Sequence, residues 1–251
     1  MQWRNAIKRP TSEWYFNQYK LSNTPLREVV DLRPWASTIE DQRHLGSCTG
    51  NAIVGAYEML LKRDAPTQYT ELSRLFVYYN ARLFDNAVDV DVGAFLYDGV
   101  RALQRWGICS EDLCPYIIQN FAVQPSLPSY VDAATRKIKN YYRLQTLNQI
   151  LDALNHNYPI PFGANVYPAF ENITSTNPML PTPLYSEEPL GAHAMCMVGY
   201  NIPRRLILVR NSFGRDWGEE GHCWMPFEYV LNESLDCWVF DIELNPLVKV
   251  E

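Results

Sequence analysis

The apolar residues of this 251-residue chain change their spacing near its middle. Before Pro125 they recur at helical intervals in three stretches, as on the buried face of a helix. These stretches are residues 53–61, 72–79 and 96–103. After Pro128 most apolar residues fall in short runs bounded by Gly, Pro or Asn, which is typical of strands. These runs are residues 159–166, 194–200, 205–211, 222–227 and 236–240.

The order of these two patterns limits the fold. Helices followed by strands are typical of an α+β protein, in which the two kinds of element segregate. We therefore expect residues 29–128 to form a mainly helical lobe and residues 129–251 a lobe that is mainly sheet. Within the second lobe, residues 131–142 and 147–154 also have helical spacing. Residues 1–28 have no sustained periodicity and are predicted to be an extension.

Charge and composition exclude several classes of function. The net charge is −6 and no basic cluster is longer than the pair in Arg204-Arg205, so nucleic acid is not an expected partner. No apolar run has the length of a membrane span. The N-terminus lacks the apolar stretch of a secretory signal. We expect a monomer.

The six cysteines bear on redox compartment and on metal binding. They form no Cys-x-x-Cys pair, so neither a thioredoxin-like nor a zinc-ribbon protein is favoured, and no metal or cofactor is expected. If Cys48 is a free nucleophile, five cysteines remain and cannot all pair within the chain. This favours a reducing, intracellular compartment.

Cys48 stands at the start of the first expected helix. A thiol at a helix N-terminus lies near the positive end of the helix dipole, which favours thiolate. Gly46 and Ser47 allow a tight turn into this helix, and the amide of Gln42 could return over the turn. Together with the Cys48 N–H it would form an oxyanion hole. The alternative is a buried structural cysteine that begins a core helix.

Four histidines are candidates for the base that would activate Cys48. The sequence context predicts an exposed turn residue for His44, a polar helix end for His156 and a surface strand position for His222. His193 has small neighbours in Gly191-Ala192-His193-Ala194, which leave room for a substrate beside its ring. The alternative for His193 is a core histidine whose hydrogen bonds are satisfied.

Asn211 is a candidate for the residue that orients His193. It ends an expected strand, and a neutral amide can accept a hydrogen bond from the imidazole N–H. Phe213 and Trp217 follow closely and could shield this hydrogen bond from water. The alternative is an ordinary strand-to-turn ending, for which Asn before Ser is common.

The order Gln42, Cys48, His193, Asn211, with 145 residues from the cysteine to the histidine, fits papain-type spacing. The sequence resembles the papain-like cysteine peptidases from about Val30 to Val239, and within them a branch found in bacteria and large viruses. That branch has Leu-Gly-Ser-Cys-Thr at the nucleophile, as here. Further matching motifs are Ser73-Arg74-Leu75-Phe76-Val77-Tyr78-Tyr79-Asn80, Val198-Gly199-Tyr200, Asn211-Ser212-Phe213-Gly214 and Trp217-Gly218-Glu219.

The resemblance implies a helical lobe and a β-barrel lobe with the active-site cleft between them. It implies four catalytic residues: Gln42 in the oxyanion hole, Cys48 as nucleophile, His193 as base and Asn211 as orienting residue. The expected contacts with substrate are Gly93 and Ala94 on the cleft wall, together with Gly191 and Trp217. Gly163, Gly191 and Ala194 suggest a roomy apolar pocket for the second residue before the cut.

The chain departs from the family pattern at several positions. Well-known relatives carry a disulfide between the positions of Leu45 and Asp91, and both cysteines are missing here. Phe213 stands where a Trp is usual, and Ala94 stands where a second glycine is usual. Because the matching region begins near Val30, the long helical propeptide of secreted relatives is not expected here.

The activity that the resemblance implies is hydrolysis of polypeptides through a thioester acyl-enzyme, without a cofactor. The same acyl-enzyme could instead serve deamidation or transpeptidation. A third reading is a catalytically silent binding protein on the same scaffold, although the intact set of four residues argues against it.

Two segments carry predictions of their own. Residues 171–192 contain four prolines and are expected to form a mobile loop that borders the cleft before His193. Residues 1–28 contain Trp14, Tyr15, Phe16 and Tyr19, large rings that need a surface to pack on. They are expected either to lie in the substrate cleft as an inhibitory segment or to pack on the back of the barrel lobe.

Overall fold

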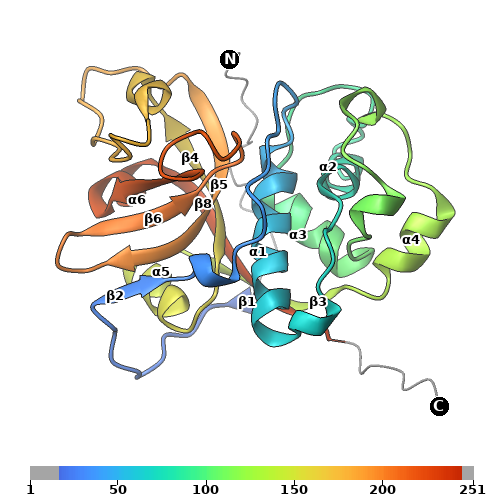
Figure 1. The fold of residues 1–251 in the computed structure, drawn as a ribbon, viewed down its shortest axis with the longest axis horizontal. Helices are drawn as coiled ribbons and strands as arrows, with labels where there is room; N and C mark the ends of the chain where they lie inside the picture. Colours follow the sequence, from blue (N-terminus) through green and yellow to red (C-terminus); the bar gives the residue numbers. More distant parts are fainter. Residues whose placement is uncertain (1–16, 245–251) are drawn as a thin grey trace.

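The helix α1 (Cys48–Asp64) lies at the centre of the computed structural model, which describes residues 17–244. It begins directly after Ser47, and every residue from Cys48 to Leu61 is buried. A helix that is buried on all faces needs partners on all sides. α1 packs against strand β5 on one side and against helices α2 and α3 on the other (Figure 1).

Three further helices build the lobe on the α2 side of α1: α2 (Arg74–Leu83), α3 (Leu96–Arg105) and α4 (Leu127–Ala133). The Ser73 hydroxyl caps α2 by accepting a hydrogen bond from the Phe76 N–H at 3.0 Å. The helices expected over residues 53–61, 72–79 and 96–103 are confirmed. No helix within residues 17–244 is long and apolar enough to cross a bilayer.

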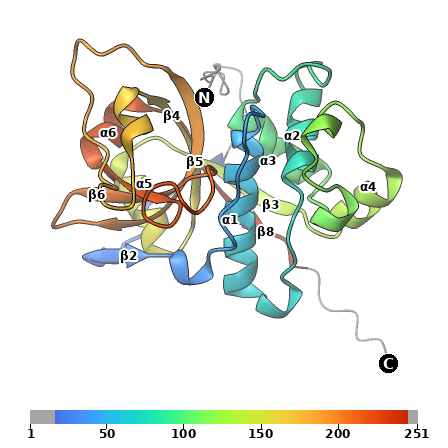
Figure 2. The same ribbon diagram turned by 45° about the horizontal axis from the view of Figure 1, so that its top comes forward.

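The other lobe is built on a sheet whose strands, within residues 17–244, follow the order β1-β3-β8-β4-β5-β6-β7, with β2 also on β5. The strands are β1 (Asn17–Gln18), β2 (Val29–Asp31), β3 (Ile138–Leu144), β4 (Ile160–Val166), β5 (Gly191–Asn201), β6 (Leu206–Arg210), β7 (His222–Pro226) and β8 (Ser234–Ile242). Helices α5 (Leu147–Asn155) and α6 (Phe227–Glu233) pack on this sheet (Figure 2). Short 3-10 helices occupy Arg33–Trp35, Pro66–Gln68, Glu111–Leu113, Ile118–Asn120 and Pro168–Asn172.

The helix expected over residues 131–142 is wrong beyond Ala133. α4 ends at Ala133, and β3 pairs antiparallel with β8. Tyr141 and Tyr142 favour a strand, and their partner strand lies far along the chain, so the local spacing does not reveal the pairing. The helix expected over residues 147–154 is confirmed as α5, and the five expected strands are confirmed as β4 to β8.

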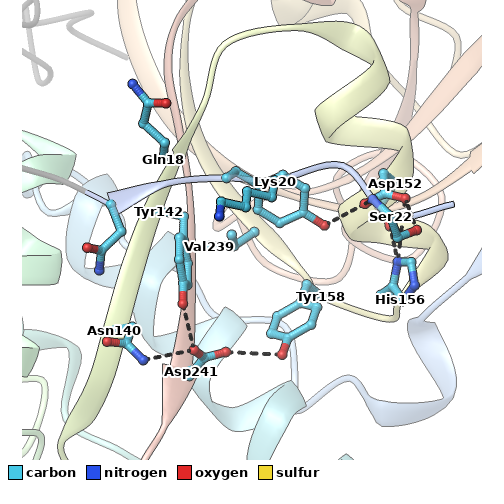
Figure 3. A pocket seen from close by; sticks show the side chains of 12 residues that line it. Gln18, Lys20, Ser22, Asn140, Tyr142, Asp152, His156, Tyr158, Val239 and Asp241 are labelled. Atoms are coloured by element: carbon cyan, nitrogen blue, oxygen red, sulfur yellow. Dashed lines mark hydrogen bonds and ion pairs between the residues drawn. The ribbon is translucent and has the colours of Figure 1, made fainter.

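Residues 17–28 lie on the sheet lobe. β1 runs parallel to β3, and the ring of Tyr19 meets that of Tyr142 edge-on at a centroid distance of 6.3 Å. The Asp152 carboxylate on α5 accepts hydrogen bonds from the hydroxyls of Tyr19 at 2.9 Å and Ser22 at 2.7 Å (Figure 3). A cavity of about 690 Å³ lies between this segment and strands β3 and β8.

The position of this segment bears on the two expectations for residues 1–28. The cavity beside it is also lined by Tyr158, and the guanidinium of Arg63, in the last turn of α1, lies 5.1 Å from that ring. Because a helix of this length spans about 25 Å, the segment is remote from Cys48 at the other end of α1. Its described part therefore packs on the barrel lobe. Trp14, Tyr15 and Phe16 lie outside the described residues.

Gly107, just after α3, provides a test of the packing within the helical lobe, because it lies against Ala133 at the end of α4. Its φ is +85°, and a Cβ there would meet the Ala133 carbonyl oxygen at 1.9 Å. We expect Gly107→Ala to lower the free energy of unfolding by about 2–4 kcal/mol, from left-handed strain plus the clash. Urea unfolding followed by circular dichroism measures the loss.

Gly214→Ala is the matched control for the Gly107 variant. Gly214 has a similar φ of +79°, but the nearest atom that a Cβ there would meet is the Asp41 Cβ at 3.8 Å. Strain alone should then cost about 1–2 kcal/mol. Equal losses in the two variants would show that the contact with Ala133 does not limit how closely the turn after α3 approaches the end of α4.

Candidate active site

Cys48 is fully buried between α1 and β5. Burial raises the pKa of its thiol to about 11, although the nearby backbone N–H groups of Ala194, Thr49 and Cys48 itself oppose the rise. Two of these donors belong to the first turn of α1, and the third belongs to β5. The sulfur therefore sits where the N-terminus of the helix meets the strand.

His193 is the third residue of β5, directly before the Ala194 whose N–H reaches the Cys48 sulfur. Its side chain is buried, and its Nε2 lies 2.8 Å from the Asn211 Oδ1. Burial lowers the pKa of the imidazole to about 4, and the hydrogen bond with Asn211 opposes this shift. The ring of Phe213 stacks on the imidazole at a centroid distance of 4.8 Å. This is the position from which Phe213 was expected to shield the hydrogen bond between His193 and Asn211 from water.

The amide of Asn211 has a fixed orientation. It lies directly after β6, and its Oδ1 also accepts a hydrogen bond from the Ser212 backbone N–H at 2.8 Å. Because a backbone N–H can only donate, the oxygen must face both Ser212 and His193. His193 Nε2 is therefore the protonated nitrogen, and Nδ1 is the ring nitrogen that can exchange a proton with a thiol.

Gln42 is buried and tied to the same region. Its Oε1 accepts a hydrogen bond from the Ser212 hydroxyl at 2.6 Å, and its Nε2 donates one N–H to the Leu45 carbonyl at 3.0 Å. Its backbone N–H donates to the Ser212 carbonyl at 2.9 Å. A primary amide has two N–H groups, so the second remains a candidate donor to an oxyanion.

The four expected substrate contacts lie on both lobes. Gly93 donates its N–H to the Tyr78 hydroxyl at 3.2 Å, and the Ala94 carbonyl accepts from the Thr49 hydroxyl at 2.9 Å, beside Cys48. Gly191 opens β5 two residues before His193. The Trp217 ring lies 5.1 Å from that of Phe170, which in turn meets the His193 ring edge-on. Their contact with a substrate stays a prediction.

Asp91 holds the turn that leads into Cys48. Its Oδ1 accepts hydrogen bonds from the Gly46 N–H at 3.0 Å and from the Tyr78 hydroxyl at 2.6 Å. This is the place where the resemblance would put one half of a disulfide. All six cysteines are free thiols in this structure, so hydrogen bonds perform the tethering here.

The other three histidines lie elsewhere. His44 is exposed in the turn before α1. His156 caps the end of α5, as expected, and its Nδ1 lies 2.8 Å from the Asp152 carbonyl oxygen. The surface position expected for His222 is wrong, because β7 is covered and only 4% of the residue is exposed. Within residues 17–244 no cluster of three or more His, Cys, Asp or Glu residues could hold a metal ion.

Residues 171–192 are less irregular than expected. Gly191 and Ala192 already belong to β5. Leu180 is buried, and hydrogen bonds join Pro178 and Leu180 to the backbone of Trp224 at 2.8 and 2.9 Å. The mobility of the remaining loop stays a prediction.

Three neighbours of the site escaped the sequence analysis. The Tyr116 hydroxyl donates to the Gln42 carbonyl at 3.1 Å and contacts the Ser47 hydroxyl. Phe170 packs against His193, and Ser212 bonds Gln42. Only Ser212 had a local signal, because it directly follows Asn211. Tyr116 lies in a loop and Phe170 in the short 3-10 helix Pro168–Asn172, and neither segment has an apolar spacing that predicts its place in the fold.

Comparisons with known sequences find related proteins. The family model described as papain family cysteine protease matches residues 26–234. An uncharacterized peptidase C1-like protein of Acanthamoeba polyphaga mimivirus is 34% identical over 237 residues, which cover 89% of this chain and 76% of the viral protein.

Solved structures give the same fold. Xylellain, a cysteine protease from Xylella fastidiosa, matches with a TM-score of 0.87 and 30% identity over 96% of each chain. A digestive procathepsin L from the larval midgut of Tenebrio molitor matches with a TM-score of 0.72 and 21% identity, over 94% of this chain and 76% of that one. These matches confirm the expected two-lobed α+β fold and the resemblance to proteins of bacteria and large viruses.

The pKa shifts of Cys48 and His193 generate a prediction. The pair gains a proton only when the pH falls towards 4 and loses one only when the pH rises towards 11. Its protonation is thus constant across neutral pH. We expect the rate at which iodoacetamide alkylates Cys48 to be flat between about pH 5 and pH 10, because the shared proton can move from sulfur to nitrogen at any pH in this range.

Mass spectrometry of the Cys48 peptide isolates this rate from those of the other thiols. The His193→Ala variant is the control, because it leaves Cys48 without a nearby base. A wild-type rate that climbs tenfold per pH unit through pH 8, as for an ordinary thiol, would contradict the paired protonation.

Proposed function

The chain belongs to the papain family of cysteine proteases, and from this premise we propose that it hydrolyses peptide bonds with Cys48 as nucleophile, His193 as base and Asn211 as orienting residue. One observation carries the assignment. The His193 Nε2 lies 2.8 Å from the Asn211 Oδ1, while the N–H of Ala194, the next residue along β5, lies near enough to the Cys48 sulfur to oppose the rise in its pKa. This arrangement supports a nucleophile, a base and an orienting residue that act in the order acyl transfer needs.

The reaction proceeds in two steps. The thiol proton moves from Cys48 Sγ to His193 Nδ1, and the thiolate attacks the peptide carbonyl carbon. The resulting oxyanion is bound by the Cys48 N–H and the Gln42 amide. His193 then gives its proton to the leaving amine as the C–N bond breaks. Water, deprotonated by His193, attacks the thioester and releases the acid and the free thiol.

The hydrogen bonds around Gln42 support its role. An oxyanion donor is effective only when it is already oriented before the charge develops. Ser212 and Leu45 hold the two ends of the Gln42 amide, so this donor needs little reorganisation during the reaction. We assign polypeptide binding to Gly93, Ala94, Gly191 and Trp217, which flank Cys48 and His193 along the chain or in space.

Substitution of the three residues tests the assignment. We expect Cys48→Ala and His193→Ala each to lower kcat by about 10⁵-fold or more, and Asn211→Ala to cause a loss ten- to a hundredfold smaller, because an orienting residue is less essential than the groups it serves. Cleavage of a fluorogenic peptide measures kcat, and melting temperatures verify folding. Turnover retained in Cys48→Ala, or more damage from Asn211→Ala than from His193→Ala, would show that the roles are wrongly assigned.

Deamidation and transpeptidation use the same acyl-enzyme and are separated from hydrolysis by their products. Mass analysis of a peptide with one glutamine and one scissile bond distinguishes a deamidated product, a ligated product and two fragments. An epoxide that labels Cys48 in the wild type but not in His193→Ala separates all three activities from a catalytically silent binding protein.

We further propose that residues 1–16 act as an inhibitory segment. They contain four large aromatic side chains, Trp3, Trp14, Tyr15 and Phe16, and rings of this size favour an apolar groove over solvent. Residues 17–28 are anchored on the barrel lobe through Asp152, so only the preceding residues remain as a candidate. The proposal rests on their composition.

Removal of residues 1–16 alone tests this inhibition. We expect kcat/KM to rise while the melting temperature stays unchanged, since Tyr19 and Ser22 keep their bonds to Asp152. Asp152→Asn in the full-length chain is the control, because it weakens the anchor and leaves the first 16 residues in place. Unchanged kinetics together with a lower melting temperature would identify residues 1–16 as a stabilising segment instead.

A further inference from the structure

Asn51 is a buried amide one turn after Cys48 on α1, and one of its polar atoms is unpaired. Its Nδ2 donates to the Ser47 carbonyl oxygen at 3.0 Å and to the Ser47 hydroxyl at 3.2 Å. Because a carbonyl oxygen can only accept, the amide cannot be turned round, and Oδ1 must point the other way. That oxygen has no hydrogen-bond partner among the described residues, although only 5% of Asn51 is exposed.

Asn211 presents the complementary case. Its Oδ1 is held by His193 and by the Ser212 N–H, so its Nδ2 also has one possible direction. This nitrogen has no hydrogen-bond partner among the described residues, and only 3% of Asn211 is exposed. A donor without an acceptor and an acceptor without a donor are therefore both buried near the active site. Unpaired buried polar groups of this kind are rare in native proteins.

One small cavity touches both residues. It is about 10 Å³ in volume, and its wall includes Asn51 and Ala52 of α1, Ala194 of β5, and Asn211. A cavity of about this volume holds one water molecule when its wall offers at least two polar partners. The residues that line this cavity are themselves buried.

We propose that this cavity binds one water molecule that accepts a hydrogen bond from Asn211 Nδ2 and donates one to Asn51 Oδ1. Asn51 is then a positioning residue, since it acts on the imidazole through the water and Asn211. The bridge links the helix that carries Cys48 to the segment that orients His193, which are contributed by different lobes. This inference rests on the proposed roles of Cys48, His193 and Asn211.

The bridge explains how the Asn211 amide is held in its plane. The two hydrogen bonds at Oδ1 decide which way round the amide lies, but both end on one atom and leave some tilt about the last side-chain torsion. A further bond at Nδ2 fixes that torsion, and with it the direction of the bond from His193 Nε2 to Oδ1. Because this bond raises the pKa of His193 against the effect of burial, loosening it should shift the pKa of His193 further down.

A crystal structure of the inactive Cys48→Ala protein tests the water directly, because it needs neither catalysis nor a change at Asn51. We expect one ordered water within hydrogen-bond distance of Asn51 Oδ1 and Asn211 Nδ2. Empty density in the cavity, or a direct contact between the two amides, would overturn the proposal. This result is independent of the proposed function, which instead fails if Cys48→Ala retains activity.

The variant Asn51→Leu tests the positioning role, because leucine has a similar size and no acceptor. Asn80→Leu is the matched control: Asn80 is a buried residue of α2 whose Nδ2 donates to the Phe76 carbonyl at 2.8 Å, the same bond to the preceding turn. Its Oδ1 accepts from the Tyr130 hydroxyl at 2.9 Å. Both variants should lower the melting temperature.

Only Asn51→Leu should change the chemistry. We expect kcat to fall about ten- to a hundredfold at unchanged KM, and the acid limb of the pH–rate profile to move to lower pH. If Asn51→Leu matches Asn80→Leu in kcat and in pH profile, Asn51 is merely structural and the positioning role is wrong. Should Asn51→Leu fail to fold, the Cys48→Ala crystal still decides whether the bridge exists.

Discussion

The contact between the N-terminus of α1 and β5 organises the whole protein. At this point backbone N–H groups of the helix and of the strand lie beside the Cys48 sulfur. Contact of the thiol with both elements fixes the position of α1 along β5. The lobes cannot slide along one another without breaking this contact, so the packing that forms the reactive centre also sets the register of the lobes.

Burial determines the protonation states of Cys48 and His193. Both Cys48 and His193 are withdrawn from water, which favours the uncharged form of each. A charge in such a place is tolerated only next to its partner, so a proton is passed between the two groups more readily than exchanged with solvent. The buried guanidinium of Arg210 also has polar partners close to it. It donates to the carbonyls of Ser37 and Thr38 at 2.8 and 2.7 Å and so ties the end of β6 to the loop before Gln42.

The sequence was informative wherever the signal was local. The position of Cys48 at a helix start, the small residues around His193 and the strand ending at Asn211 could all be read from a few neighbours. β3 could not, because Tyr141 and Tyr142 become a strand through pairing with β8. The burial of His222 and the contact of Phe170 with His193 were missed for a related reason. Both depend on segments that only the folded chain brings together. The pairing of Asn51 with Asn211 across one cavity is equally invisible along the chain.

The hydrogen bonds that Asp91 accepts make the loop before Cys48 insensitive to reducing agents. A cysteine nucleophile survives only while thiol reagents or their cellular counterparts keep its sulfur from oxidising. In a chain whose nucleophile loop is held by a disulfide, the same reagents can loosen the loop that they are meant to serve. Here the Gly46 N–H and the Tyr78 hydroxyl are held by a carboxylate, which no electron donor can cleave. The sulfur can therefore be kept fully reduced without any loss in the geometry that presents it.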